Sequence, residues 1–143
     1  MKQLLVAVDF GPQTDQLLAK TIAWAKAFEA KVWLVHIAAP EPDFVGYDIG
    51  PQYIRDTRAD LLREEHRNLQ SYANLIQKQG MDAEGLLIQG ATVDMIVEEA
   101  KKLEVDLIIM GHDEHGWLYQ LLMGSTAAGV IKKADIPVLI VPF

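Results

Sequence analysis

The sequence has 143 residues, of which 50% are hydrophobic and 23% are charged, and its formal net charge is −7. A chain of this length fits one domain, predicted at residues 1–143, with a core that needs no covalent cross-links. The acidic charge argues against a general nucleic-acid or anionic-membrane surface, because both favour an excess of lysine and arginine. Phosphate is therefore expected to bind, if at all, only at a local site built mainly from backbone donors. The lack of cysteine excludes disulfides, thiolate metal sites and a cysteine nucleophile.

The N-terminal apolar run is too short for a signal peptide or a membrane span, because it ends at Asp9 and Gly11. No other apolar stretch of the sequence approaches the roughly 18 residues that a membrane helix needs. We therefore expect a soluble, cytoplasmic protein that binds neither a membrane nor a nucleic acid.

Short runs rich in Leu, Ile and Val alternate along the chain with segments of helical period. Each run is continuously apolar, which is typical of strands buried on both faces of a sheet. Alternating strands and helices favour parallel β-α units with right-handed crossovers. The sequence therefore predicts an α/β fold with a five-stranded parallel doubly wound sheet and helices on both faces. The predicted strands are 4–8, 32–37, 86–88, 107–110 and 138–141.

Four apolar stripes mark the predicted helices. We expect Gly80 to end the second helix and Pro137 to introduce the last strand. The segment 38–51 is rich in proline, glycine and acid, which predicts a loop over the strand ends, either a binding lid or a surface excursion. The stripes consist of Leu17, Leu18, Ile22, Ala25 and Phe28; of Ile54, Leu61, Leu62, Leu69, Tyr72, Leu75 and Ile76; of Val93, Ile96, Val97 and Ala100; and of Ala127, Val130 and Ile131.

Ligands of open α/β sheets bind outside the carboxyl ends of the strands, where the strand order reverses. After the fourth predicted strand, Gly111 would let the backbone approach a ligand. Gly124-Ser125-Thr126 opens the last predicted helix, whose free N–H groups and dipole favour an anion. Ser125 or Thr126 would either cap this helix only or also donate a hydroxyl to phosphate.

Three segments resemble one known family. The opening VAVDFG is similar to the family's first strand, which ends in Asp, and VWLVHI is similar to its second strand. The ending GSTAAGVIKKADIPVLIVP matches the family's last helix and strand almost position by position. On these segments the chain resembles the universal stress protein family over nearly all of its length. The resemblance implies a Rossmann-like fold of the adenine nucleotide alpha hydrolase type and a site for ATP, ADP or AMP.

By this resemblance, Ala7 and Ile37 would line the adenine and Met110 would lie beside the ribose or base. Asp9 would accept hydrogen bonds from ribose hydroxyls or the adenine amino group, or would instead anchor the turn into the first helix. His36 is expected to bond the main chain inside the fold rather than act as a base. The implied nucleotide-binding residues are Ala7, Val8, Asp9, Ile37, Met110, Gly111, His112, Gly116, Gly124, Ser125 and Thr126.

The glycine pattern of the ATP-binding members, G-x2-G-x9-G-[S/T], is altered in this chain. Its first and last glycines map onto Gly111 and Gly124, but Glu114 occupies the middle position and Asp113 precedes it. Each carboxylate in contact with a triphosphate would cost about 1 kcal/mol even at a water-like dielectric. Gly116, two positions later, could supply the missing flexibility or could be the second glycine of a pair found in some relatives.

Three interpretations of residues 112–115 remain open. The segment could belong to a site that binds adenosine or AMP and grips a triphosphate weakly. Alternatively, Asp113 and Glu114 hold Mg²⁺ or Mn²⁺, which bridges to phosphate and reverses the repulsion. The third interpretation is a solvated polar loop that binds no ligand.

The sequence carries no Ser-His-Asp spacing, no nucleophile elbow and no P-loop. A phospho-acceptor receiver domain is disfavoured because Gln89 and Gly90, rather than an Asp, follow the third strand. We therefore expect a regulatory nucleotide-binding stress-response module rather than an enzyme, with slow ATP hydrolysis at most. The alternative is a nucleotide-independent stress protein that acts through protein contacts. In both cases the resemblance implies a homodimer that pairs through the apolar C-terminal strand, a predicted sheet edge.

Overall fold

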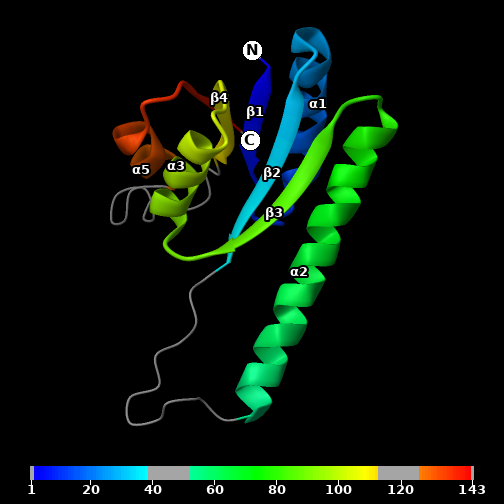
Figure 1. Cartoon of the computed structure of the whole chain (residues 1–143), viewed down its shortest axis with the longest axis vertical. Coiled ribbons are helices and arrows are strands. Elements are labelled where there is room, and N and C mark those ends of the chain that lie inside the picture. Colours follow the sequence, from blue (N-terminus) through cyan, green and yellow to red (C-terminus); the bar gives the residue numbers. More distant parts are fainter. Residues whose placement is uncertain (1, 39–51, 113–125, 143) are drawn as a thin grey trace.

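The computed structural model describes residues 2–38, 52–112 and 126–142. Five parallel strands form one sheet in the order β3-β2-β1-β4-β5, which confirms the predicted doubly wound α/β fold (Figure 1). The strands are β1 (Gln3–Ala7), β2 (Lys31–Ala38), β3 (Ala83–Gln89), β4 (Leu107–His112) and β5 (Val138–Pro142). The helices are α1 (Thr14–Phe28), α2 (Gln52–Lys78), α3 (Thr92–Lys102) and α5 (Thr126–Lys133).

Helices cover both faces of the sheet, and each face has its own buried core. One core joins Leu4 and Val6 of β1 to α1 and α2, and the other joins Leu5 of β1 to α3 and α5. The side chains of these three consecutive residues point alternately to the two faces. Since both faces are covered, all three residues are fully buried. This confirms the predicted burial on both faces for the central strand.

The two edge strands depart from the prediction of burial on both faces. Only Ala83 in β3 and Val141 in β5 are buried within these two strands. β3 is also longer than the predicted segment 86–88, because Glu84 and Gly85 pair with β2 although they are not apolar. Backbone pairing rather than hydrophobicity defines the start of this strand.

The predicted helical stripes were too wide. In α2, the buried residues Leu69, Ala73 and Ile76 are three or four positions apart and form one narrow face toward the sheet. With 27 residues α2 is about 40 Å long, so its N-terminal part extends beyond the strands (Figure 1). Four residues predicted to be in the core are instead 39% to 54% exposed, namely Phe28, Leu61, Leu75 and Ile131.

Gly80 and Pro137 lie where the sequence predicted the end of a helix and the start of a strand. α2 ends at Lys78, and Gly80 follows with a φ of +93°, a left-handed conformation that glycine adopts without strain. Pro137 directly precedes β5, and its carbonyl accepts a hydrogen bond of 3.0 Å from the Ile108 N–H group. Of the predicted loop 38–51, Ala38 is the last residue of β2, and residues 39–51 lie outside the described residues.

The strand order reverses at β1. Ala7 pairs with Val35 of β2 on one side and with Met110 of β4 on the other. The chain builds outward from β1 through β2 to β3, and then returns to add β4 and β5 on the opposite side. Connections therefore leave β1 and β4 in opposite directions, which opens a crevice at the carboxyl ends of these strands.

At the amino ends of the strands, the Asp106 carboxylate links the start of β4 to the start of β1. It accepts hydrogen bonds from the backbone N–H groups of Lys2 at 2.8 Å and Gln3 at 2.9 Å. These two bonds stabilise the ionised form and hold the pKa of Asp106 below its ordinary value of 3.8.

We predict that Asp106→Asn lowers the free energy of unfolding at neutral pH. In strong acid the variant and the wild type should be equally stable. Because the pKa is lower in the folded state, the stabilisation by Asp106 is complete above the ordinary value of 3.8 and disappears as pH falls through the folded-state pKa. Urea unfolding from neutral pH to about pH 2.5 measures this difference. The control is Glu98→Gln, an exposed change on α3. A stability difference between wild type and Asp106→Asn that stays constant with pH would contradict the prediction.

Helix α5 approaches α3 closely because Gly129 has no side chain. A Cβ atom at Gly129 would lie 2.7 Å from Val93 Cγ2, well inside van der Waals contact. We predict that Gly129→Ala lowers the free energy of unfolding by about 1 kcal/mol, because the clash outweighs the better helix propensity of alanine. In a Val93→Ala background the clash is absent, so the same change should raise stability. Thermal unfolding of the four proteins tests this, and an equal effect in both backgrounds would sink the packing explanation.

Candidate functional site

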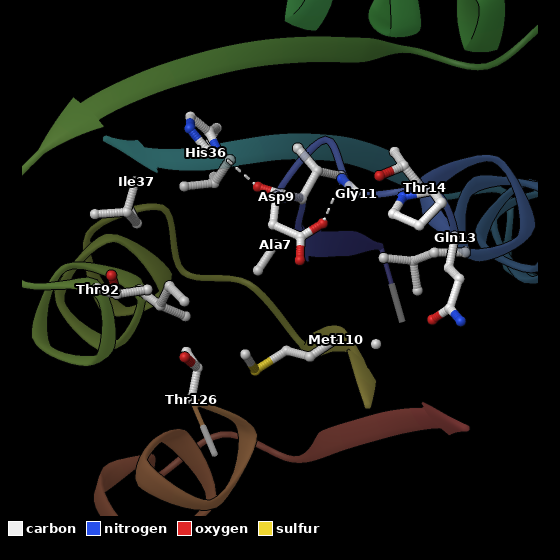
Figure 2. A pocket seen from close by; sticks show the side chains of 16 residues that line it. Ala7, Asp9, Gly11, Gln13, Thr14, His36, Ile37, Thr92, Met110 and Thr126 are labelled. Atoms are coloured by element: carbon white, nitrogen blue, oxygen red, sulfur yellow. Dashed lines mark hydrogen bonds between the residues drawn. The ribbon is translucent and has the colours of Figure 1, made fainter. Parts of the chain in front are cut away.

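A pocket of about 290 Å³ lies in the crevice at the carboxyl ends of β1, β2 and β4 (Figure 2). Residues from three strand ends form its floor, and the first turns of three helices reach its walls. Its lining residues are Ala7, Val8, Asp9, Gly11, Pro12, Gln13, Thr14, Leu17, Val35, His36, Ile37, Thr92, Ile96, Met110, Gly111 and Thr126.

The structure brings together the residues that the sequence assigned to the adenosine half of a site. Ala7, Val8 and Asp9 come from β1 and its following loop, and the rest come from β2, β4 and α5. His112 ends β4, but its side chain is outside the described part of the chain. Asp113, Glu114, His115, Gly116, Gly124 and Ser125 also lie outside the described residues. The predicted site residues that line the pocket are Ala7, Val8, Asp9, Ile37, Met110, Gly111 and Thr126.

Asp9 anchors the loop that leads from β1 into α1. Its Oδ1 atom accepts a hydrogen bond of 2.9 Å from the Gly11 N–H group. This contact confirms the loop-anchor alternative for Asp9. The side chain is nevertheless exposed in the pocket, and within the described residues Oδ2 accepts no hydrogen bond. Asp9 can therefore hold the loop with one oxygen and present the other to a ligand.

His36 is held by the main chain, as predicted. Its Nδ1 atom lies 2.7 Å from the Val8 carbonyl oxygen, so Nδ1 carries a proton and donates it to this acceptor. The Phe10 ring covers the imidazole with a centroid separation of 4.5 Å. Phe10 adopts a φ of +61°, which is unusual for a bulky residue and turns the chain sharply after β1. In this conformation its ring packs against His36 and Tyr72.

The structure adds the first turns of two helices that the sequence did not assign to the site. The β1–α1 loop contributes Gly11 to Thr14, and the start of α3 contributes Thr92 and Ile96. Neither helix has a side-chain cap, so N–H groups of the first turn remain available for other acceptors. Thr92 and Thr126 lie across the pocket from Asp9 (Figure 2). A signal was present, because α1, α3 and α5 each begin with a threonine directly ahead of a predicted apolar stripe.

Thr14 lines the pocket from the first residue of α1. Only 4% of its surface is exposed, so the packing of α1 against the sheet fixes its position.

The lining combines apolar and neutral polar groups. Ile37, Ile96 and Met110 offer an apolar surface, and threonine hydroxyls and Gln13 offer neutral donors and acceptors. Asp9 is the one carboxylate, and no lysine or arginine is present among the described lining residues. Within residues 2–38, 52–112 and 126–142, no cluster of three or more His, Asp or Glu could hold a metal ion. Among the same residues, no helix is long and apolar enough to cross a membrane.

Comparisons with known proteins agree with this architecture. The family model described as the universal stress protein family matches residues 1–142. The chain is 30% identical over 141 residues to universal stress protein MJ0531 of Methanocaldococcus jannaschii, a match that covers 98% of this chain and 81% of that protein.

Solved structures share the fold. The hypothetical protein MJ0577 is 25% identical with a TM-score of 0.80, over 99% of this chain and 96% of that one. A universal stress protein solved in complex with cAMP is 23% identical with a TM-score of 0.69, over 99% and 96% of the two chains. The universal stress protein of Archaeoglobus fulgidus solved in complex with dAMP is 22% identical with a TM-score of 0.64, over 98% and 97%. Since the family model spans nearly the whole sequence, the chain belongs to the universal stress protein family.

Proposed function

We propose that the pocket binds an adenine nucleotide and that the protein acts as a regulatory stress-response module rather than as an enzyme. The observation that carries this proposal is the pocket where the strand order reverses, lined by Ala7, Asp9, Ile37 and Met110. Two relatives of the same fold were solved with cAMP and dAMP, which supports an adenine nucleotide as the ligand class.

The described walls suit a nucleoside. A flat base can pack against Ile37, Ile96 and Met110, because these side chains line the pocket from three different elements. The free Oδ2 atom of Asp9 is an acceptor for a sugar hydroxyl or a base amino group. A volume of about 290 Å³ lies at the lower end of the range for small-ligand pockets.

We further propose that the site grips the outer phosphates of ATP weakly. No described lining residue is a lysine or an arginine, so phosphate must rely on N–H groups, hydroxyls or a cation. Asp113 and Glu114 follow β4 directly in the sequence, where their charges would repel a triphosphate unless Mg²⁺ or Mn²⁺ lies between them.

Calorimetric titration with adenosine, AMP, ADP and ATP, each with and without Mg²⁺, tests the ligand class. We predict that AMP binds and that ATP binds no more tightly than AMP in the absence of metal. Asp9→Asn should weaken AMP binding about tenfold, because a hydrogen bond to a charged acceptor is lost. Asp82→Asn, directly before the amino end of β3 and far from the pocket lining, is the matched control. It should change the affinity less than about twofold. If none of the four compounds binds below millimolar concentration, the proposed nucleotide binding is wrong.

Glu114→Gly separates the two proposals for the phosphate end of the site. If the Glu114 carboxylate repels phosphate, we predict that its removal strengthens metal-free ATP binding about fivefold, equivalent to roughly 1 kcal/mol. If it holds a cation, the same change should weaken Mg²⁺-dependent binding. The AMP affinity serves as the internal reference, and an unchanged ATP affinity under both conditions would eliminate both roles for Glu114.

We propose that two copies of the chain pair through β5. This strand forms one edge of the sheet, and its residues Val138 to Ile140 are only partly buried within one chain. An apolar edge of this kind favours pairing with a second strand, and a two-fold arrangement would close it. We predict a dimer mass by light scattering at micromolar concentration, and a monomer for Ile140→Lys with an unchanged circular dichroism spectrum. A monomeric wild-type protein would refute the proposed dimer.

A further inference from the structure

The imidazole of His36 bridges the pocket and helix α2. Nδ1 faces the pocket side, where it bonds the Val8 carbonyl oxygen at 2.7 Å. Nε2 faces α2, where it lies 3.5 Å from Oε2 of Glu65. The two side chains are largely removed from water, since 12% of His36 and 21% of Glu65 is exposed. One ring thus connects the end of β1 to a helix on the outside of the sheet.

Oε2 of Glu65 lacks a hydrogen bond. The atom is buried and has no hydrogen-bond partner within the described residues, although it faces Nε2 of His36. A buried carboxylate oxygen without a donor is costly, and the apolar residue Leu69 occupies the next turn of the same helix face. A proton on Nε2 of His36 would supply the missing positive partner.

Both ring nitrogens of His36 face acceptors. A neutral imidazole has one N–H group, so when Nδ1 donates to Val8 the lone pair of Nε2 points at the Glu65 carboxylate. An imidazolium carries protons on both nitrogens and satisfies both acceptors. The Phe10 ring packs beside the imidazole, at 4.5 Å between centroids and with a tilt of 44°.

Other ionisable groups surround this contact. β3, the strand paired with β2 at this position, brings the apolar residue Leu87 opposite His36. Tyr72 also stacks on Phe10, and burial raises the pKa of its phenol above the ordinary value of 10.0, so the phenol stays neutral in mildly acidic and neutral solution. In the described part of the chain, Glu65 alone makes an ion pair with His36. Besides Glu65, the ionisable groups that contacts relate to this ring are Tyr72 on α2, which stacks on Phe10, Asp15 on α1, whose charge acts on Tyr72, and Asp9 after β1, which lines the same pocket. Arg58 lies about two turns before Glu65 on α2.

We propose that His36 is a pH-dependent positioning residue, which in its protonated form clasps α2 to the pocket floor through Glu65 and Val8. Mild acid strengthens the clasp, and alkaline solution leaves Glu65 facing a lone pair. The proposal does not depend on which ligand the pocket takes, and its tests use the protein without nucleotide.

A double-mutant cycle tests this proposal. His36→Gln, Glu65→Gln and the double variant are unfolded with urea at about pH 5.5 and pH 8, a range in which carboxylates stay ionised and imidazoles change charge. We expect a favourable coupling of about fivefold in the unfolding equilibrium constant at pH 5.5, and less than about twofold at pH 8. The control cycle combines His36→Gln with Glu64→Gln, a change at the exposed neighbour of Glu65. It should show no coupling at either pH. Equal coupling at the two pH values, or none at pH 5.5, would overturn the proposal.

Hydrogen exchange provides a readout that uses one conservative variant. Protection of the backbone N–H groups around Glu65, corrected for intrinsic exchange, should rise about fivefold from pH 8 to pH 5.5 in the wild type. In Glu65→Gln it should not change with pH, whereas Glu64→Gln should follow the wild type. If Glu65→Gln keeps the pH response, the clasp does not exist, even if the His36 variants do not fold.

Discussion

Ala7 of β1 lies beside Met110 of β4 although most of the chain separates them in sequence. This parallel pairing is the constraint on which the rest of the molecule depends. It divides the chain into one half that builds β2 and β3 and another that builds β4 and β5 on the other side. Since no connection passes directly from β1 to β4, their carboxyl ends have open space above them. The pocket occupies this space, so the strand order determines where the pocket lies.

The electrostatic character of the site follows from the same geometry. Parallel strands bring the first turns of α1, α3 and α5 to one edge, and each helix begins with a threonine beside the pocket. Available N–H groups and hydroxyls give this edge a partial positive character in a chain whose formal net charge is −7. Local donors of this kind can therefore coexist with an acidic net charge.

The sequence predicted the fold because continuous apolar runs are a strong signal for buried parallel strands. It failed where this signal is weak, as at Glu84 and Gly85, which join β3 through backbone pairing alone. It also overestimated the core in α2. Leu61 precedes the buried face that begins at Leu69, and Leu75 lies beside the narrow face formed by Leu69, Ala73 and Ile76.

The predicted site residues that directly follow strands line the pocket, since their position depends only on the fold. Thr14 and Thr92 were not predicted, because their place in the pocket depends on how α1 and α3 pack against the sheet. The contact between His36 and Glu65 was also inaccessible to sequence reasoning, because it joins two elements whose relative register only tertiary packing determines.

Chemical-shift mapping with AMP tests the central claim most directly. In a ¹⁵N-labelled protein, addition of AMP should shift the backbone N–H signals of Ala7, Ile37 and Gly111 at the carboxyl edge of the sheet. The signals of Gln3 and Asp106, at the opposite edge, should stay in place. Shifts confined to the amino edge, or no shifts at millimolar AMP, would contradict a nucleotide site between β1 and β4.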